Sequence, residues 1–110
     1  MVGLGSLVRR VARAMHPFVL VTANGQPWPV DTDRASEIAD RLWEKHAGRE
    51  LSKRFHHAIA VRAYVRPDQS ELAVLLAAIS EWVDEVGEEA VGEQVLNLQA
   101  AVHAELTAFD

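Results

Sequence analysis

The longest regular pattern of apolar residues in this chain lies between Asp68 and Phe109, and its period is that of α-helices. Two apolar stripes recur there at steps of three or four residues: Leu72, Leu75, Leu76, Ile79, Trp82, Val83 and Val86, then Val91, Val95, Leu98, Val102, Leu106 and Phe109. Asp68 followed by Glu71 predicts a capping box at the start of the first helix. Gly87 is expected to end it, because each glycine inside one long helix would cost about 1 kcal/mol relative to alanine. The pattern therefore predicts an antiparallel helical pair.

A short β-hairpin is predicted nearer the start of the chain. Phe18–Ala23 is rich in β-branched and apolar residues, and Asn24-Gly25 is a strong signal for a two-residue hairpin turn. The return strand, Gln26–Val30, contains two prolines, which cannot donate hydrogen bonds to a neighbouring strand, so it is expected at an edge of the sheet. Trp28, between those prolines, is expected either to cover the core or to anchor a partner.

Three further segments complete the pattern. Val2–Met15 and Asp33–Ala47 carry apolar residues at helical spacing. Phe55–Val65 alternates between two sets of side chains in a way that favours a third strand. As a helix, the same segment would place Arg62 on the apolar stripe, so the strand is the preferred interpretation.

These elements predict a single α+β domain over residues 1–110. We expect a small three-stranded antiparallel sheet, made of the hairpin and one further strand. Three to four helices pack with it, and the chain ends in the antiparallel helical pair. The alternative is a mostly all-α fold with a β-hairpin.

The charge of the chain divides sharply between its two halves. The net charge is −5. All eleven basic residues precede Pro67, beside six acidic ones, which gives that part +5, whereas the ten acidic residues that follow give −10. Such asymmetry can signal a charged partner, but we favour a simpler interpretation in which the halves pack together and neutralise each other in part.

The candidate chemistry is sparse. The chain has no cysteine, which excludes disulfides and thiol catalysis. His56 and His57 would point to opposite faces of a strand, so they could not bind one ion together. No histidine or carboxylate pair has the spacing of a metal site, and no nucleophile or phosphate-binding motif occurs. We therefore expect no cofactor and no metal, and a role other than catalysis. A small enzyme that uses a histidine as acid or base stays open as an alternative.

The preferred function is a small protein-interaction module, adaptor or regulatory, that associates with a protein partner or with a second copy of itself as a homodimer. The stripe of Val95, Leu98, Val102 and Leu106 is near heptad spacing and could form the dimer seam, or else the domain's own core. The residues that could contact a partner are Arg9, Arg10, Arg13, Trp28, His56, His57, Arg62 and Tyr64.

Nucleic acid is a possible but not favoured partner. Arg9, Arg10, Arg13, Arg62 and Arg66 could form one basic face, yet the sequence pI of about 5.5 is far below that of dedicated nucleic-acid binders. No apolar run approaches the ~20 residues of a membrane span. The absence of cysteine fits a cytoplasmic protein, and we expect that location.

Overall fold

The computed structural model describes residues 18–23, 25–44 and 48–108. Three strands and five helices lie in these ranges. In chain order they are β1 Phe18–Ala23, β2 Gln26–Asp31, α2 Thr32–Glu44, α3 Arg49–Val61, β3 Tyr64–Val65, α4 Gln69–Val86, α5 Glu88–Val91 and α6 Glu93–Thr107. The α+β class is therefore confirmed. The predicted helix Val2–Met15 lies outside the described residues.

The three strands form one mixed sheet in the order β2-β1-β3. The hairpin is confirmed: β1 and β2 pair antiparallel from Ala23 opposite Gln26 to Phe18 opposite Asp31. The proline-containing strand β2 lies at an edge, as its missing donors require. β3 pairs with β1 in parallel, so the prediction of an all-antiparallel sheet is wrong in this detail. A parallel neighbour needs a long connection, and α2 and α3 supply it.

The prediction that Phe55–Val65 is a strand is wrong for most of its length. Helix α3 runs through Val61, and only Tyr64–Val65 is extended. Leu51, Phe55 and Ala58 share one helix face and are buried, which stabilises the helix over the strand. Arg62, whose place on that stripe argued against a helix, is the C-cap in the left-handed conformation (φ 57°), just beyond the helix end.

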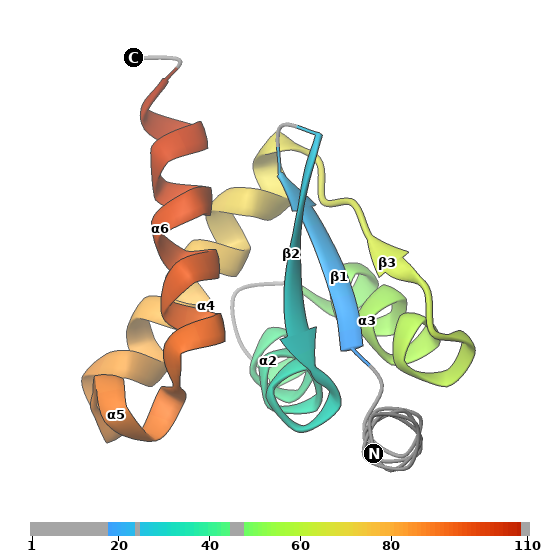
Figure 1. The fold of residues 1–110 in the computed structure, drawn as a ribbon, viewed down its shortest axis with the longest axis horizontal. Helices are drawn as coiled ribbons and strands as arrows, with labels where there is room; N and C mark the ends of the chain where they lie inside the picture. Colours follow the sequence, from blue (N-terminus) through green and yellow to red (C-terminus); the bar gives the residue numbers. More distant parts are fainter. Residues whose placement is uncertain (1–17, 24, 45–47, 109–110) are drawn as a thin grey trace, which may run out of the picture.

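The C-terminal helical pair is confirmed and contains an extra turn. Asp68 and Glu71 form the predicted capping box at the start of α4. The short helix α5 separates α4 from α6, and glycines with positive φ stand at both breaks: Gly87 (φ 87°) and Gly92 (φ 96°). In Figure 1, α6 and α5 lie on the left of the molecule, and β3 and α3 lie on the right.

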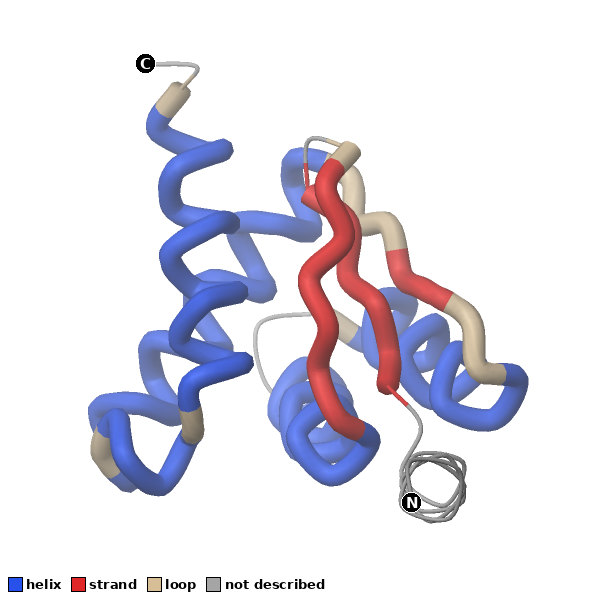
Figure 2. Tube along the Cα trace, in the orientation of Figure 1, coloured by secondary structure: helices blue, strands red, loops and turns tan. Residues whose placement is uncertain are grey.

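The core lies between one face of the sheet and the helices. Figure 2 shows the three strands beside the larger helical part of the molecule. The inward strand residues Val19, Val21, Val30 and Val65 belong to the same buried cluster as the apolar faces of α2, α3, α4 and α6. In α2 these buried residues are Ala35, Ile38, Ala39 and Leu42. One face of the sheet is therefore occupied by helices.

Candidate interaction surface

The opposite face of the sheet is apolar and exposed. On the central strand, Phe18 and Leu20 alternate with the buried valines and are 42% and 36% exposed. Residues directly opposite in register share a face, so Pro29 of β2 and Tyr64 of β3 flank Leu20 on its two sides. Tyr64 is 59% exposed. We call this surface the outer sheet face, formed by Phe18, Leu20, Pro27, Pro29 and Tyr64. No element among the described residues covers it.

Both edges of the sheet resist pairing with another strand. At one edge, Pro27 and Pro29 of β2 lack the N–H groups that a new neighbouring strand would need. At the other edge, β3 is only two residues long. Short edge strands and prolines are the devices by which proteins avoid edge-to-edge aggregation. The outer sheet face is therefore better suited to a partner than either edge.

The two sides of the outer sheet face carry opposite charges. Beside β2, Asp31 and Asp33 line a shallow hollow of about 300 Å³ together with Phe18, Thr32 and Gln94. Asp31 accepts a hydrogen bond from the backbone N–H of Arg34, and its own N–H donates to Gln94 Oε1, each at 2.8 Å. Beside β3, the exposed Arg62 and Arg66 precede and follow Tyr64 in the chain. The apolar strip thus lies between an acidic side and a basic side.

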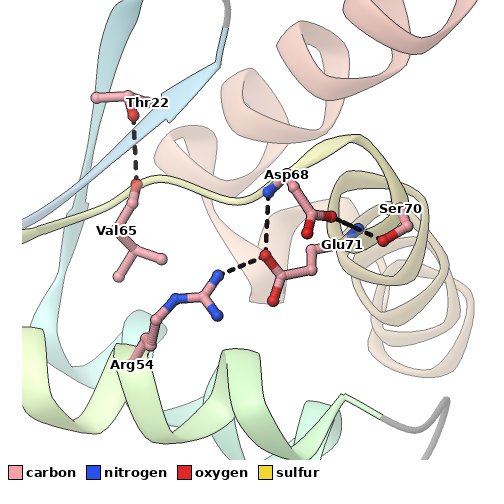
Figure 3. Close-up of polar contacts among 6 residues, drawn as sticks. All are labelled: Thr22, Arg54, Val65, Asp68, Ser70 and Glu71. Atoms are coloured by element: carbon pink, nitrogen blue, oxygen red, sulfur yellow. Dashed lines mark hydrogen bonds and ion pairs between the residues drawn. The ribbon is translucent and has the colours of Figure 1, made fainter.

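A polar cluster fixes the start of α4 against α3, as Figure 3 shows. Arg54 donates to Glu71 Oε1 at 2.5 Å, and the same oxygen accepts the N–H of Asp68 at 3.0 Å. Asp68 Oδ1 accepts the N–H of Glu71 and the hydroxyl of Ser70, at 2.8 and 2.7 Å. These bonds lower the pKa of Glu71, through Arg54 first, and lower the pKa of Asp68, through the Glu71 N–H first. Glu71 in turn raises the pKa of Arg54.

Ion pairs between described residues join the basic part of the chain to the acidic part. Arg54 pairs with Glu71, and Arg41 pairs with Glu85 at 2.8 Å while also lying 3.7 Å from Glu37. The guanidinium of Arg41 also lies 5.4 Å from the centre of the Trp82 ring. These contacts agree with the expectation that the two halves neutralise each other in part.

Trp28 faces the core rather than the outer sheet face. It stands opposite Val21 in the register, is half-buried, and packs against the buried cluster. Its indole Nε1 is buried and has no hydrogen-bond partner in the part of the chain that the structure describes.

The two adjacent histidines lie on α3, not on a strand, so the expectation that they point to opposite faces of a sheet is wrong. Both are exposed. His56 Nε2 is 3.9 Å from Asp40 Oδ1, too long for a hydrogen bond and open to solvent on both sides. Within the described ranges, no group of three or more histidine, aspartate or glutamate side chains could hold a metal ion.

The other predicted residues divide between the surface and the core. Tyr64 lies on the outer sheet face, and Arg62 and Arg66, two residues before and after it in the chain, are exposed. Arg9, Arg10 and Arg13 lie outside the described residues. Val95, Leu98 and Val102 are fully buried within the chain's own core, and Leu106 packs against it, which is the second of the two roles foreseen for this stripe.

Sequence reasoning missed Phe18 and Leu20 as surface residues. The sequence did indicate that the two belong together, because side chains alternate along a strand and residues two apart point to the same face. Both alternating sets of side chains in Phe18–Val21 are apolar, however, so the pattern alone does not say which face the helices cover.

No family model matches this sequence, and no curated protein or solved structure is significantly similar to it. Among the helices of the described residues, none is long and apolar enough to cross a membrane. The outer sheet face is therefore the feature on which a functional argument can be built.

Proposed function

We propose that this protein is a protein-interaction module, adaptor or regulatory in role, that self-associates through the outer sheet face. The observation that carries the proposal is the row of exposed apolar side chains across three neighbouring strands, with Leu20 at its centre. Contiguous exposed apolar patches with a polar rim mark interaction sites in soluble proteins. A tyrosine at the side of the patch suits this use, since its ring is apolar and its hydroxyl can stay in water.

The rim of this surface supports the same proposal. Interfaces between proteins combine an apolar centre with a charged and polar periphery. Here the centre is Leu20 and Pro29, and the periphery includes Asp33 on one side and Arg66 on the other. A cytoplasmic location belongs to the proposal as well, on the ground that the chain contains no cysteine.

The test is a measurement of molecular mass by light scattering after size exclusion, at low salt and in about 1 M NaCl, where charges are screened beyond about 3 Å. We expect a dimer under both conditions, because burial of apolar surface is not weakened by salt. Leu20→Lys should yield a folded monomer, since it places a charge at the centre of the contact.

Val86→Lys is the matched control. Val86 is also an exposed apolar residue, 47% accessible, but it ends α4 on the far side of the molecule from β3. This variant should remain a dimer. If Leu20→Lys is folded by circular dichroism and still dimeric, the outer sheet face is not the contact and the proposal fails.

Single-stranded nucleic acid is a second candidate partner, favoured by one observation. The exposed ring of Tyr64 stands between Arg62 and Arg66 in the chain, and an aromatic ring beside arginines can stack a base and hold its phosphates. Binding of a labelled oligonucleotide at low salt, lost in Tyr64→Ala, would support this role. Absence of binding at low salt would eliminate it.

A further inference from the structure

We propose that the chain's own first residues, 1–17, which lie outside the described part of the structure, cover the outer sheet face and that a partner must displace them to bind there. The inference rests on the proposed function, because this N-terminal segment and a second copy compete for the same surface. It adds a form of regulation, since the face is available only in the fraction of molecules in which the segment is displaced. Its elements are the exposed residues Phe18, Leu20 and Tyr64 and the apolar stripe of the segment.

The sequence of the N-terminal segment has the pattern of a helix that lies on an apolar surface. Its apolar residues recur at steps of three or four and fall on one side of the helix predicted for Val2–Met15; they are Leu4, Leu7, Val8, Val11 and Met15. Its polar residues fall on the opposite side; they are Ser6, Arg9, Arg10 and Arg13. Isolated helices of about 12–15 residues are marginal in water. The predicted helix therefore needs an apolar surface under its stripe, with its arginines left in water.

The segment joins the sheet at the face that it is proposed to cover. Phe18, the first residue of the central strand β1, is 42% exposed on that face. Two residues, His16 and Pro17, separate it from Met15 in the sequence. The three Cα–Cα steps span at most about 11 Å, enough to bring a helix of about 10–12 Å diameter over the sheet. Connections of two to six residues between a helix and a strand are common. A helix that ends at Met15 can thus run back along β1.

The face and the predicted helix match in size. A helix over Val2–Met15 is about 21 Å long, and the six residues of β1 extend over about 20 Å. The strands of the sheet lie about 4.8 Å apart, so the two outer strands are separated by about 10 Å, the width of one helix. A single helix therefore suffices to cover the strip of Pro29, Leu20 and Tyr64.

The covalent connection favours the chain's own segment over a second copy as the first occupant. A segment tethered by a short connection has an effective concentration of about 1 mM or more at its site. A second copy reaches the face only in proportion to the protein concentration. Helices on both faces of a sheet are also one of the stable layer arrangements of small domains. The segment therefore occupies the face in the monomer, and self-association requires its displacement.

The experiment measures how fast a thiol at the centre of the face reacts with iodoacetamide. The chain has no cysteine, so Leu20→Cys supplies a single thiol on a small apolar side chain. The rate is measured in the full chain, below the dimer dissociation constant, with the apolar stripe intact and with Leu7→Asp and Val11→Asp added. The substituted stripe should give a reaction about tenfold faster, because the covered face is open in about a tenth of the molecules.

Controls separate displacement of the segment from general effects. Val86→Cys, on α4, should react at the same rate with either stripe. Ser6→Asp with Arg13→Ala changes the net charge as much as the stripe substitutions, but on the polar side of the predicted helix. It should leave the rate of Leu20→Cys within about twofold. Circular dichroism checks the fold of each variant. Val8→Pro, which breaks the predicted helix without adding charge, should accelerate the reaction as well and replaces the charged stripe if that chain does not fold.

The same equilibrium sets the strength of self-association. A dimer requires the face to be free in both copies, so covering about nine molecules in ten weakens the dimer by about a hundredfold. Sedimentation of the chain with Leu7→Asp and Val11→Asp, and with Leu20 retained, should therefore give a dimer about a hundredfold tighter than that of the wild type.

The outcomes separate the inference from the proposed function. Equal rates for Leu20→Cys with the intact and the substituted stripe overturn the inference, while the proposed function is decided by the mass of the wild-type chain. Protection that disappears on dilution means that a second copy covers the face, which overturns the inference and supports the proposed function. A faster reaction in a substituted chain that stays monomeric supports the segment as occupant and refutes self-association.

Discussion

At the scale of single residues, the indole of Trp28 has an unusual environment. Its ring packs against the core, yet its buried Nε1 lacks a hydrogen-bond partner among the described residues. A buried donor left without a partner costs about 1–3 kcal/mol, while the apolar ring contributes through its burial. The ring and the N–H of this residue therefore oppose each other energetically.

Two substitutions separate these contributions. Trp28→Phe removes the N–H and keeps most of the apolar ring, so we expect the free energy of unfolding to stay within about 1 kcal/mol of the wild-type value. Trp28→Ala removes the ring from a half-buried site and should cost about 2 kcal/mol. Urea denaturation followed by circular dichroism measures both. A Phe variant as unstable as the Ala variant would show that the indole N–H is hydrogen-bonded after all.

At the scale of elements, the breaks around α5 depend on backbone conformations that glycine alone adopts easily. Gly87 and Gly92 both combine a positive φ with ψ near 158°. A residue other than glycine in this backbone conformation destabilises the folded state by about 1–3 kcal/mol. A Cβ on Gly87 would meet nothing within 4 Å, so its substitution tests backbone conformation without a clash.

We expect Gly87→Ala to destabilise the protein by about 1–3 kcal/mol in thermal or urea unfolding. The control is Ala90→Ser at an exposed position of α5, which should change stability by no more than about 0.5 kcal/mol. The sign of the Gly87 effect is informative. Alanine would stabilise one continuous helix by about 1 kcal/mol, so an increase in stability would contradict the observed break.

The elements also show what sequence patterns can and cannot predict. The hairpin, the capping box and the glycine break followed from local chemistry, and all three were predicted at the correct residues. Helix α3 was not, because the alternation in Phe55–Val65 fits a strand as well as a helix when many residues are small or ambivalent. Burial of Phe55 against the other elements decides between them, and that information is not local.

At the scale of the whole molecule, the same limit explains why the outer sheet face was not predicted. The periodicity of Phe18–Ala23 assigns Phe18 and Leu20 to one side, but the packing of helices against the sheet determines which side is buried. Tyr64 was identified as a contact residue from its type alone. Its position beside Leu20 follows from the parallel pairing of β3, which the predicted antiparallel sheet did not contain.

The polar cluster of Arg54, Asp68 and Glu71, which joins the two halves of the chain, predicts that stability depends on pH. The folded state lowers the pKa of Glu71 and of Asp68, so both bind protons less readily there than in the unfolded chain. Their contribution is fully present above the unfolded carboxyl pKa of about 4 and is lost as the pH falls through the lower folded value. The melting temperature should therefore drop below about pH 4.

Glu71→Gln isolates the contribution of this carboxylate. Glutamine can still accept the Asp68 N–H within the capping box, but it has no charge for Arg54 and does not titrate. The variant should have a lower melting temperature than the wild type at pH 7. Its melting temperature should fall less than that of the wild type when the pH is lowered. Thermal unfolding between pH 3 and pH 7 compares the two. If the melting temperatures of both proteins fall in parallel with pH, Glu71 does not contribute to the loss of stability in acid.

The prolines of β2 have a further consequence for how large an assembly can become. A chain with an exposed apolar surface and an unprotected strand edge can bind further copies in two directions and grow into fibres. This chain presents an apolar strip on its outer sheet face and offers β2 as a blocked edge. In the proposed dimer, each copy covers the other's outer sheet face, which leaves no such face for a third copy. Raising the protein concentration should therefore convert the chain to dimers without forming larger species. The solution should stay clear at concentrations where a comparable sheet with an open edge would turn turbid.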